Sequence, residues 1–514
     1  MLNLSGIYSE LIVNLCRYII FRTGHNISSG NALLGIMINR IIKATLFFAL
    51  ALMLALPAQA RKKQGYEITL SINHGKDTMM FMGHYFAKGN SIIDTALRDR
   101  KGRFVFESKT DTLAPGLYFF ANPEGKYVEF VVYHEPPFFN FVTDEEDWTT
   151  NMKVKGSPEN DFFYRFHRID ADYAKDLDDK YFSMDSVEFM AYKRKRLLSL
   201  DSVKIGMIEE NPSRFLSKMM LATKEVYPPI VDEKGDTLSE AQRRDYYLEH
   251  YFDNIALEDD AIIRTPKKVF YDQVMSLYNE YLKYAPPSVI EHSIDIMMER
   301  AKKAPTVFQY LTLTLTQKYL QSNVMVYDEV YVHMVKNYFA SDYNFWSTPS
   351  NIEQELMRAT KWERLLVGKE APELILFDTL HNPHSLHALP YKWKLLVFWS
   401  PNCGHCKHII PTVYQVFEKY QAKYDIGAFT ILSDPDDKTR AEWRKFMKDH
   451  NMTSPTWLSL DGGEANVDWH DVYDITTTPQ IYLIDEDNII QAKHLGESSV
   501  EKVIQAICGN GNNE

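Results

Sequence analysis

Between residues 65 and 156, apolar and polar residues alternate in short runs. In the first run, Tyr66, Ile68, Leu70 and Ile72 fall on one face, which is the two-residue period of a half-buried β-strand. Six further runs follow, separated by turn signals rich in Gly and Pro, at 79–86, 91–97, 103–107, 117–121, 127–133 and 138–142. Strands at this spacing predict a small all-β sandwich or barrel over residues 65–156.

The apolar period becomes helical between residues 157 and 363. Phe270, Val274, Leu277 and Tyr281 recur at the spacing that places side chains along one face of a helix. Helix start signals repeat, with Ser-Pro at 157–158 and capping boxes that open at Ser239, Ser288, Thr306 and Ser350. Prolines, including those at 286–287 and 305, are expected to end helices. The pattern predicts a central all-α domain of short antiparallel hairpins.

Apolar strand-like runs and amphipathic helices alternate in the C-terminal part of the chain. Residues 394–398 form one such run, and the helix-like stretch behind it carries Ile409, Val413 and Phe417 at helical spacing. Further buried strands are expected at 425–432 and 480–485. This alternation predicts an α/β domain, so the fold class is multidomain, in the order all-β, all-α and α/β.

Residues 37–60 have the pattern of a secretory signal peptide. Arg40 and Lys43 make the start basic, residues 44–56 form an apolar run that is short for a membrane span, and Ala58 and Ala60 fit the cleavage pattern. We therefore assign residues 1–60 to a leader, with residues 1–36 either untranslated or removed. Cleavage predicts a mature chain in the periplasm, exported by a Sec-type route and without a membrane span, whereas an uncleaved leader would be a membrane anchor.

Composition and charge narrow the range of partners. The chain has 514 residues, of which 45% are hydrophobic and 25% are charged, as is usual for globular proteins. Its formal net charge of −12 argues against a nucleic-acid partner. With only four cysteines, the chain is not a small scaffold held together by disulfides.

Two of the cysteines, Cys403 and Cys406, form a Cys-x-x-Cys pair between a strand and a helix. The first sulfur is expected beside the unpaired N–H groups and the positive end of the helix dipole, which favour thiolate over thiol. Cys403 is therefore the predicted nucleophile. Cys406 is the predicted resolving thiol, because it is close enough to attack a mixed disulfide formed on Cys403.

A zinc site is the main alternative for such a pair. Zinc would need a second cysteine pair or histidines at ligand spacing. The remaining cysteines, Cys16 and Cys508, are isolated in the sequence, and only His405 and His408 lie near the motif. The pattern favours redox chemistry over metal binding.

The stretch from Trp399 to Lys407, with the sequence Trp-Ser-Pro-Asn-Cys-Gly-His-Cys-Lys, resembles the active site of the thioredoxin superfamily. Residues 367–372 resemble the entry segment of TlpA/ResA-like thiol–disulfide oxidoreductases of the Gram-negative envelope. Thr477, Thr478 and Pro479 resemble the cis-proline loop of the superfamily. The β domain and the helical region likewise resemble the N-terminal domain and the insert found in some of these proteins.

The resemblance implies a thioredoxin fold over residues 364–509. It also implies a periplasmic thiol–disulfide oxidoreductase, reductase- or isomerase-like, that acts on protein disulfides and exchanges electrons with an envelope donor or acceptor. The redox-active Cys403–Cys406 disulfide would be the reacting group, with no metal and no bound cofactor. The implied supporting residues are Trp399, Pro401, Gly404, His405, Lys407, Thr478 and Pro479.

Two positions depart from the family pattern. Thioredoxins carry a buried acid where this chain has Val397, and ResA-like proteins often carry a glutamate where it has Ile409. The usual proton acceptor for the resolving thiol is therefore missing from both places. His405, His408 or a residue of another segment is expected to serve instead, and the His405 imidazole is expected to stabilise the Cys403 thiolate.

Two other functions stay open on the sequence. A thiol peroxidase typically places a proline and a hydroxyl residue before its cysteine, and Ser400 fits the hydroxyl position whereas Leu396 does not fit the proline position. The chain could instead be a non-enzymatic binding module on a thioredoxin scaffold. The intact cysteine pair argues against that reading. The sequence does not identify the clients, the direction of electron transfer, the role of the first two domains or the oligomeric state.

Overall fold

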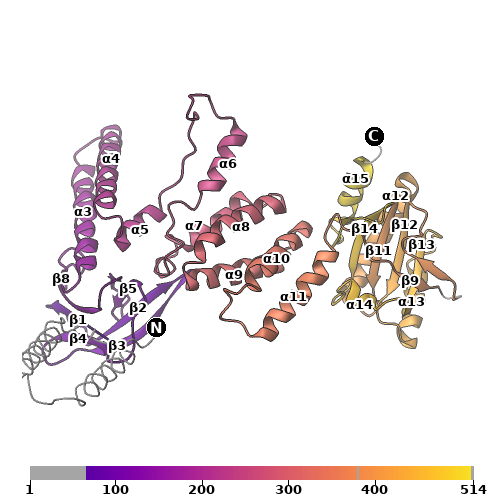
Figure 1. The fold of residues 1–514 in the computed structure, drawn as a ribbon, viewed down its shortest axis with the longest axis horizontal. Helices are drawn as coiled ribbons and strands as arrows, with labels where there is room; N and C mark the ends of the chain where they lie inside the picture. The colour runs from indigo at the N-terminus through magenta and orange to yellow at the C-terminus, as the bar shows by residue number, and fades with distance from the viewer. Residues whose placement is uncertain (1–64, 379–380, 511–514) are drawn as a thin grey trace, which may run out of the picture. The chain divides into compact units, whose positions relative to one another are not determined.

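A computed structural model describes residues 65–378 and 381–510 of the chain. The predicted leader, residues 1–60, lies outside this range. Figure 1 shows the described chain in sequence order, from indigo strands through magenta and red helices to an orange and yellow α/β domain. This arrangement confirms the predicted multidomain fold class. Of the helices in the described part, none is long and apolar enough to cross a membrane.

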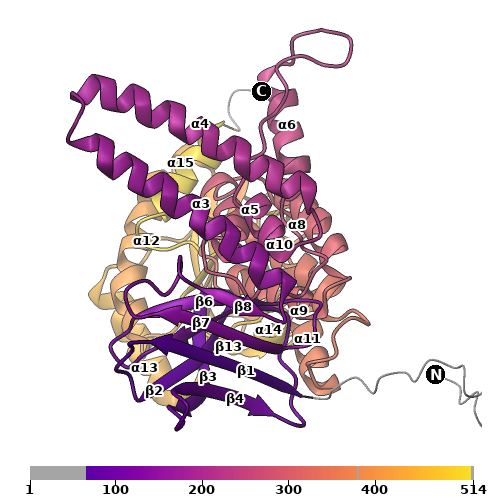
Figure 2. The ribbon, with the colours of Figure 1, turned by 90° about the vertical axis from the view of Figure 1, so that its left-hand side faces the viewer.

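The N-terminal β region consists of two four-stranded sheets (Figure 2). The first has the order β4-β1-β7-β8, with bounds Arg103–Ser108, Tyr66–Asn73, Phe138–Asp144 and Lys153–Lys155. The second has the order β3-β2-β5-β6, with bounds Gly89–Leu97, Met79–Phe86, Gly116–Ala121 and Tyr127–Val132. All pairs are antiparallel except β1 and β7, which run parallel.

Aromatic side chains from both sheets form the core of this region. Phe120 of β5 stacks on Phe130 of β6 at 4.4 Å between ring centroids and on Phe106 of β4 at 5.4 Å. Phe141 of β7 meets Phe120 edge-on at 5.5 Å. All four rings are buried, because the alternation of each strand turns them toward the space between the sheets. The predicted alternation therefore corresponds to a sandwich core.

The central region is helical, as predicted, and its later helices pack on one another. A long hairpin of α3 and α4 comes first (Figure 2). The helices are α3 (Pro158–Tyr181), α4 (Ser186–Glu210), α5 (Phe215–Ala222), α6 (Glu240–His250), α7 (Tyr271–Ser276), α8 (Pro287–Ala301), α9 (Pro305–Leu320), α10 (Asp328–Met334) and α11 (Pro349–Arg364). A 3-10 turn, Met325–Tyr327, leads into α10.

The residues at which the helices begin correct part of the sequence prediction. The cap at Ser157 and the capping box at Ser239 are present. The boxes predicted at Ser288, Thr306 and Ser350 are absent, because α8, α9 and α11 each begin at a proline that precedes the predicted box. Pro287 and Pro305 therefore begin helices instead of ending them. Proline suits the first helical position, where its missing N–H would have no partner within the helix.

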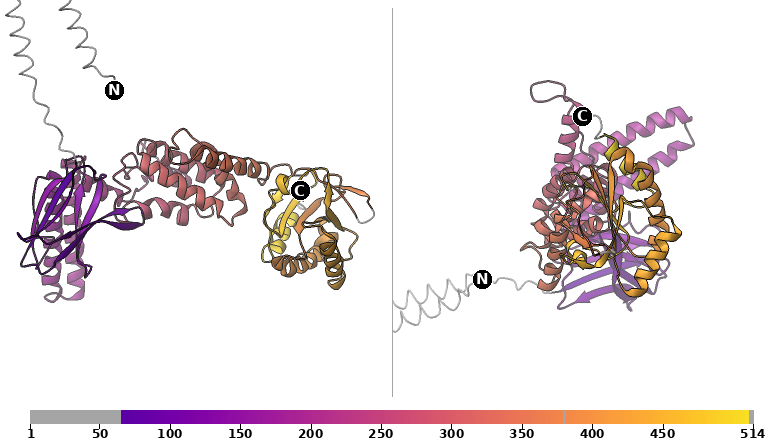
Figure 3. Two further views of the ribbon diagram at one scale, coloured as in Figure 1. Left: turned by 90° about the horizontal axis from the view of Figure 1, so that it is seen from below. Right: turned by 90° about the vertical axis from the view of Figure 1, so that its right-hand side faces the viewer.

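The C-terminal domain has a seven-stranded sheet in the order β10-β9-β13-β12-β11-β14-β15. Its strands β11 and β12 run parallel, while β11 and β14 run antiparallel. Figure 3 draws this domain in orange to yellow. Its elements are β9 (Ile375–Phe377), β10 (Pro383–Ser385), β11 (Trp393–Trp399), α12 (Gly404–Tyr424), β12 (Ile426–Leu432), α13 (Asp437–Asp449), β13 (Trp457–Ala465), α14 (Trp469–Val472), β14 (Gln480–Asp485), β15 (Ile490–Ala492) and α15 (Val500–Asn510).

Central strand β11 is buried on both faces, which explains its unbroken apolar run. Leu395, Val397 and Trp399 face an apolar cluster that includes residues of α12, α13 and α15. Leu396 and Phe398 face a second cluster that includes Trp469 of α14. Packing on both faces thus fixes the strand, and the cysteine motif directly follows its C-terminal end.

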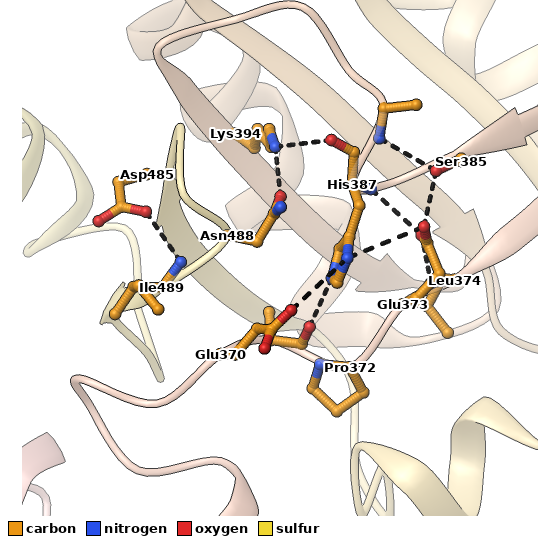
Figure 4. A network of polar contacts seen from close by, with 12 residues as sticks. Glu370, Pro372, Glu373, Leu374, Ser385, His387, Lys394, Asp485, Asn488 and Ile489 are labelled. Atoms are coloured by element: carbon orange, nitrogen blue, oxygen red, sulfur yellow. Dashed lines mark hydrogen bonds and ion pairs between the residues drawn. The ribbon is translucent and has the colours of Figure 1, made fainter.

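A polar network holds the other end of β11 (Figure 4). Lys394 is 1% exposed, and its ammonium group donates to His387 O at 3.1 Å and to the Asn488 side chain. Burial lowers the pKa of Lys394. His387 Nε2 in turn lies 2.6 Å from Ala371 O, in the entry segment. The network joins three loops beneath β11, so it fixes the strand at the end remote from the cysteines.

Candidate active site

Cys403 occupies the N-cap position of α12. Its backbone is extended, with φ −78° and ψ 121°, and its Sγ accepts a hydrogen bond from Cys406 N at 3.4 Å. A sulfur in this position meets the unpaired N–H groups and the positive end of the helix dipole, as expected from the sequence. Cys403 is partly exposed, whereas Cys406 is buried in the first turn of the helix.

A loop distant in sequence reaches the same sulfur. The Thr478–Pro479 peptide bond is cis, which confirms the expected cis-proline loop. The Cys403 thiol donates to Thr478 O at 3.2 Å, across 75 positions of the chain. The structure therefore brings together the predicted nucleophile and loop residues that the sequence singled out separately.

The two thiols have opposite electrostatic environments. Burial raises the pKa of Cys403, but hydrogen bonds from Cys406, from the side chain of Thr478 and from the backbone N–H of His405 outweigh it, so this pKa lies below its ordinary value. For Cys406 burial dominates and raises the pKa to about 12. The pair thus combines one activated thiol with one that stays protonated at neutral pH.

The supporting residues predicted from the sequence differ in what they contact. Trp399 is fully buried, and its ring lies 5.2 Å from that of Phe446 in α13. Pro401 is buried, whereas Gly404, His405 and Lys407 are exposed. His405 acts on Cys403 through its backbone N–H. A role for its imidazole, or for that of exposed His408, stays a prediction.

The structure offers no carboxylate to Cys406 from either position where related proteins carry one. Val397 is fully buried in the same apolar cluster as Cys406, and Ile409 packs against that cluster. Both side chains are apolar, so neither can accept a proton from the Cys406 thiol. This environment agrees with the high pKa of Cys406.

Sequence reasoning missed Asn402, which lies inside the motif. Its side-chain amide donates to Thr439 Oγ1 at 2.9 Å, and its backbone N–H bonds to Ser400 Oγ at 3.2 Å. These bonds tie the motif loop to α13. An amide directly before the nucleophile was the available signal, but its partner lies 37 positions away and could not be read from the pattern.

Cys508 lies apart from the motif in sequence and is buried in α15, where burial raises its pKa to about 12. Cys16 lies outside the described range. Within residues 65–378 and 381–510, no three His, Cys, Asp or Glu side chains are grouped so that they could hold a metal ion.

Alkylation of the reduced protein should label Cys403 first. The rate constant should rise with pH to a midpoint below the ordinary thiol value of about 8.5. With a pKa of about 12, Cys406 has only roughly one thiolate in a hundred thousand molecules at pH 7. Mass spectrometry of the labelled peptides tests this, and buried Cys508 serves as an internal unlabelled control. Faster labelling of Cys406 would reverse the assignment.

Three family models match separate parts of the chain. The AhpC/TSA family matches residues 367–493, and two domain families of unknown function match residues 66–163 (DUF4369) and 236–355 (DUF5106). The first match covers the cysteine motif and the cis-proline loop. The other two fall mainly on the β sandwich and on the later central helices.

Named relatives match the same C-terminal domain. The chain is 28% identical over 141 residues to the thiol-disulfide oxidoreductase ResA of Bacillus cereus (strain ZK / E33L), covering 27% of this chain and 76% of the relative. It is 25% identical over 140 residues to the thioredoxin-like protein YneN of Bacillus subtilis (strain 168), covering 27% of this chain and 78% of the relative. A solved domain of a possible thiol-disulfide isomerase from Cytophaga hutchinsonii is 28% identical, with a TM-score of 0.26, and the match covers 29% of this chain and 97% of that one.

The match to the family model and the matches to the two named relatives agree with the fold of the C-terminal domain. The C-terminal domain therefore belongs to the AhpC/TSA thioredoxin-like family, and the chain is a thiol–disulfide oxidoreductase.

Proposed function

We propose that this chain exchanges electrons with disulfides of other proteins through the Cys403–Cys406 pair. The observation that carries the proposal is the contrast between the two thiols. Cys403 caps α12, contacts Thr478 and has a lowered pKa, whereas Cys406 is buried with a pKa of about 12. A nucleophile paired with a protonated resolving thiol suits a two-step exchange.

In the first step, the Cys403 thiolate attacks one sulfur of the client disulfide. A mixed disulfide forms, and the second client sulfur leaves as a thiolate that takes up a proton. In the second step, Cys406 loses its proton and attacks Cys403 Sγ, which releases the first client sulfur as a thiol. Two electrons have then passed to the client, and the chain holds a Cys403–Cys406 disulfide. No bound cofactor takes part.

The contact between Thr478 and Cys403 supports a protein client. Thr478 O lies 3.2 Å from Cys403 Sγ, so main-chain atoms of the loop flank the point of attack. An extended peptide bound there could pair with this loop by backbone hydrogen bonds, as added strands do elsewhere. This proposal covers reductase and isomerase directions alike, because both begin with the same attack.

The proposed location is the periplasm, after removal of the leader predicted at residues 37–60. In that compartment disulfides form and persist. An envelope thiol or dithiol protein would return the Cys403–Cys406 disulfide to its reduced form, and this donor would be the second partner of the chain.

Insulin reduction by the mature chain tests the proposed function. We expect turnover that depends on an added dithiol. We also expect a Cys406→Ala variant to accumulate mixed disulfides on Cys403, because the second step is blocked. Absence of both results would contradict the proposal. Peroxide consumption without insulin reduction would favour a thiol peroxidase, and client binding without either activity would favour a binding module.

A further inference from the structure

The segment that leads into α10 contacts the C-terminal domain. Met325 packs against the apolar cluster that contains Cys406 and against which Cys403 packs. Three positions later, Asp328 Oδ2 lies 2.5 Å from Lys493 Nζ, directly after β15. The two residues are 4% and 2% exposed, so the ion pair is almost fully removed from water. The helical region thus places a buried charge within the C-terminal domain.

Asp328 is ionised at neutral pH. Burial raises the pKa of this carboxyl group, but a hydrogen bond from His494 and the charge of Lys493 outweigh it, and the pKa lies below its ordinary value. A buried ion pair of this kind constrains geometry, since removing one partner leaves the other charge uncompensated. The carboxylate of Asp328 therefore has a fixed position and can serve as an anchor, that is, a fixed hydrogen-bond acceptor for the residues that contact it.

His494 connects this anchor to the active-site loop. Its Nε2 lies 3.3 Å from Asp328 Oδ2, and its Nδ1 lies 3.0 Å from Gln480 Oε1. The imidazole therefore bridges the two side chains. His494 has a φ of 55°, a left-handed conformation that carries a cost for a residue with a Cβ and is held by surrounding contacts.

Gln480 directly follows Pro479, and its Nε2 donates to Thr477 Oγ1 at 3.4 Å. Its side chain thus contacts His494 and also Thr477, the residue directly before Thr478. The main-chain O of Thr478 accepts from the Cys403 thiol. A hydrogen bond of the Thr478 side chain acts to lower the pKa of each motif thiol, although burial outweighs it at Cys406. The position of this loop therefore bears on the reactivity of the cysteines.

We propose that Asp328 is a positioning residue of the active site, which acts through His494 and Gln480 to hold the Thr478 loop against Cys403. The central helical region then tunes the thiol chemistry of the C-terminal domain. This inference rests on the proposed function in one respect, the identity of Cys403 as the nucleophile.

The pH midpoint of Cys403 alkylation, measured on the full chain, tests the inference. In a double variant, Asp328→Asn with Lys493→Met, no charge is left buried and unpaired. We expect its midpoint to rise by about half a unit or more, which is roughly a threefold fall in rate constant below the midpoint. Gln480→Met keeps the ion pair and should raise the midpoint in the same direction. Asp328→Glu should restore a value near that of the wild type.

Lys361→Met is the matched control. Lys361 of α11 pairs with Asp471 of α14 at 2.5 Å, so this variant also removes an ion pair between the central helices and the C-terminal domain. It leaves the Thr478 loop untouched, and its midpoint should equal that of the wild type. A wild-type midpoint in the double variant or in Gln480→Met would overturn the inference, as would an equal shift in Lys361→Met. Failure of the wild type to label Cys403 first would instead overturn the proposed function.

Discussion

A Cys403→Ser variant should lose insulin reductase activity by roughly a thousandfold or more. The serine hydroxyl is a poor nucleophile toward disulfide sulfur, and no thiolate remains at the exposed end of α12. The fold should survive, because serine is a preferred N-cap residue and its oxygen can accept the Cys406 N–H that Cys403 Sγ accepts now. Turnover and thermal unfolding of the same preparation measure both points.

Two cysteine variants serve as controls for this loss. Cys406→Ser should also stop turnover, but it should still form a mixed disulfide that mass spectrometry detects. Cys508→Ala should keep its activity, because Cys508 is buried in α15 and has no role in the proposed steps. Residual activity above about a tenth of the wild type in Cys403→Ser would show that another group starts the reaction.

An Asn160→Ala variant should lose about 3–5 kcal/mol of the free energy that protects the β region against opening. Asn160 is fully buried at the start of α3. Its Nδ2 donates to Val131 O and its Oδ1 accepts from Val131 N, both at 2.7 Å. It therefore satisfies both backbone polar groups of Val131 in β6, a strand at the edge of its sheet. Alanine would leave that N–H and that C=O buried without partners.

Hydrogen exchange of peptides that cover β6 measures this effect. A loss of this size should speed exchange there by at least about a hundredfold, since each 1.4 kcal/mol is a factor of ten. Asn160→Asp should also be destabilised, because a carboxylate cannot donate to Val131 O. Asn151→Ala, at an exposed position, should leave the exchange rate unchanged. Wild-type protection in Asn160→Ala would contradict the assigned role.

Helix boundaries show where local reasoning failed. Around Thr306 the sequence contains a capping box, yet α9 begins at Pro305 with Ala304 at the N-cap. Two local signals compete there, and the proline prevails because its fixed φ suits the first turn. The β-strands were predicted more closely, because alternation over a whole run indicates which side chains face the core.

Active-site features could be predicted from local pattern only where the residues involved lie close together in the sequence. Cys403 and Cys406 are three positions apart, so a strand, a loop and a helix start predict their chemistry directly. The cis-proline loop was anticipated only through its resemblance to known proteins. The contact of Asn402 with Thr439, and that of Asp328 with His494 across 166 positions, had no pattern to reveal them.

By itself, the sequence determined three kinds of domain and a cysteine pair at the start of a helix, because these follow from periodicity and from the order of nearby residues. Only the tertiary structure decided which groups surround that pair. Burial sets the high pKa of Cys406, and hydrogen bonds from neighbouring Cys406 and His405 and from distant Thr478 set the low pKa of Cys403. Desolvation and the bond from Thr478 depend on atoms brought together by folding, so no local pattern specifies them.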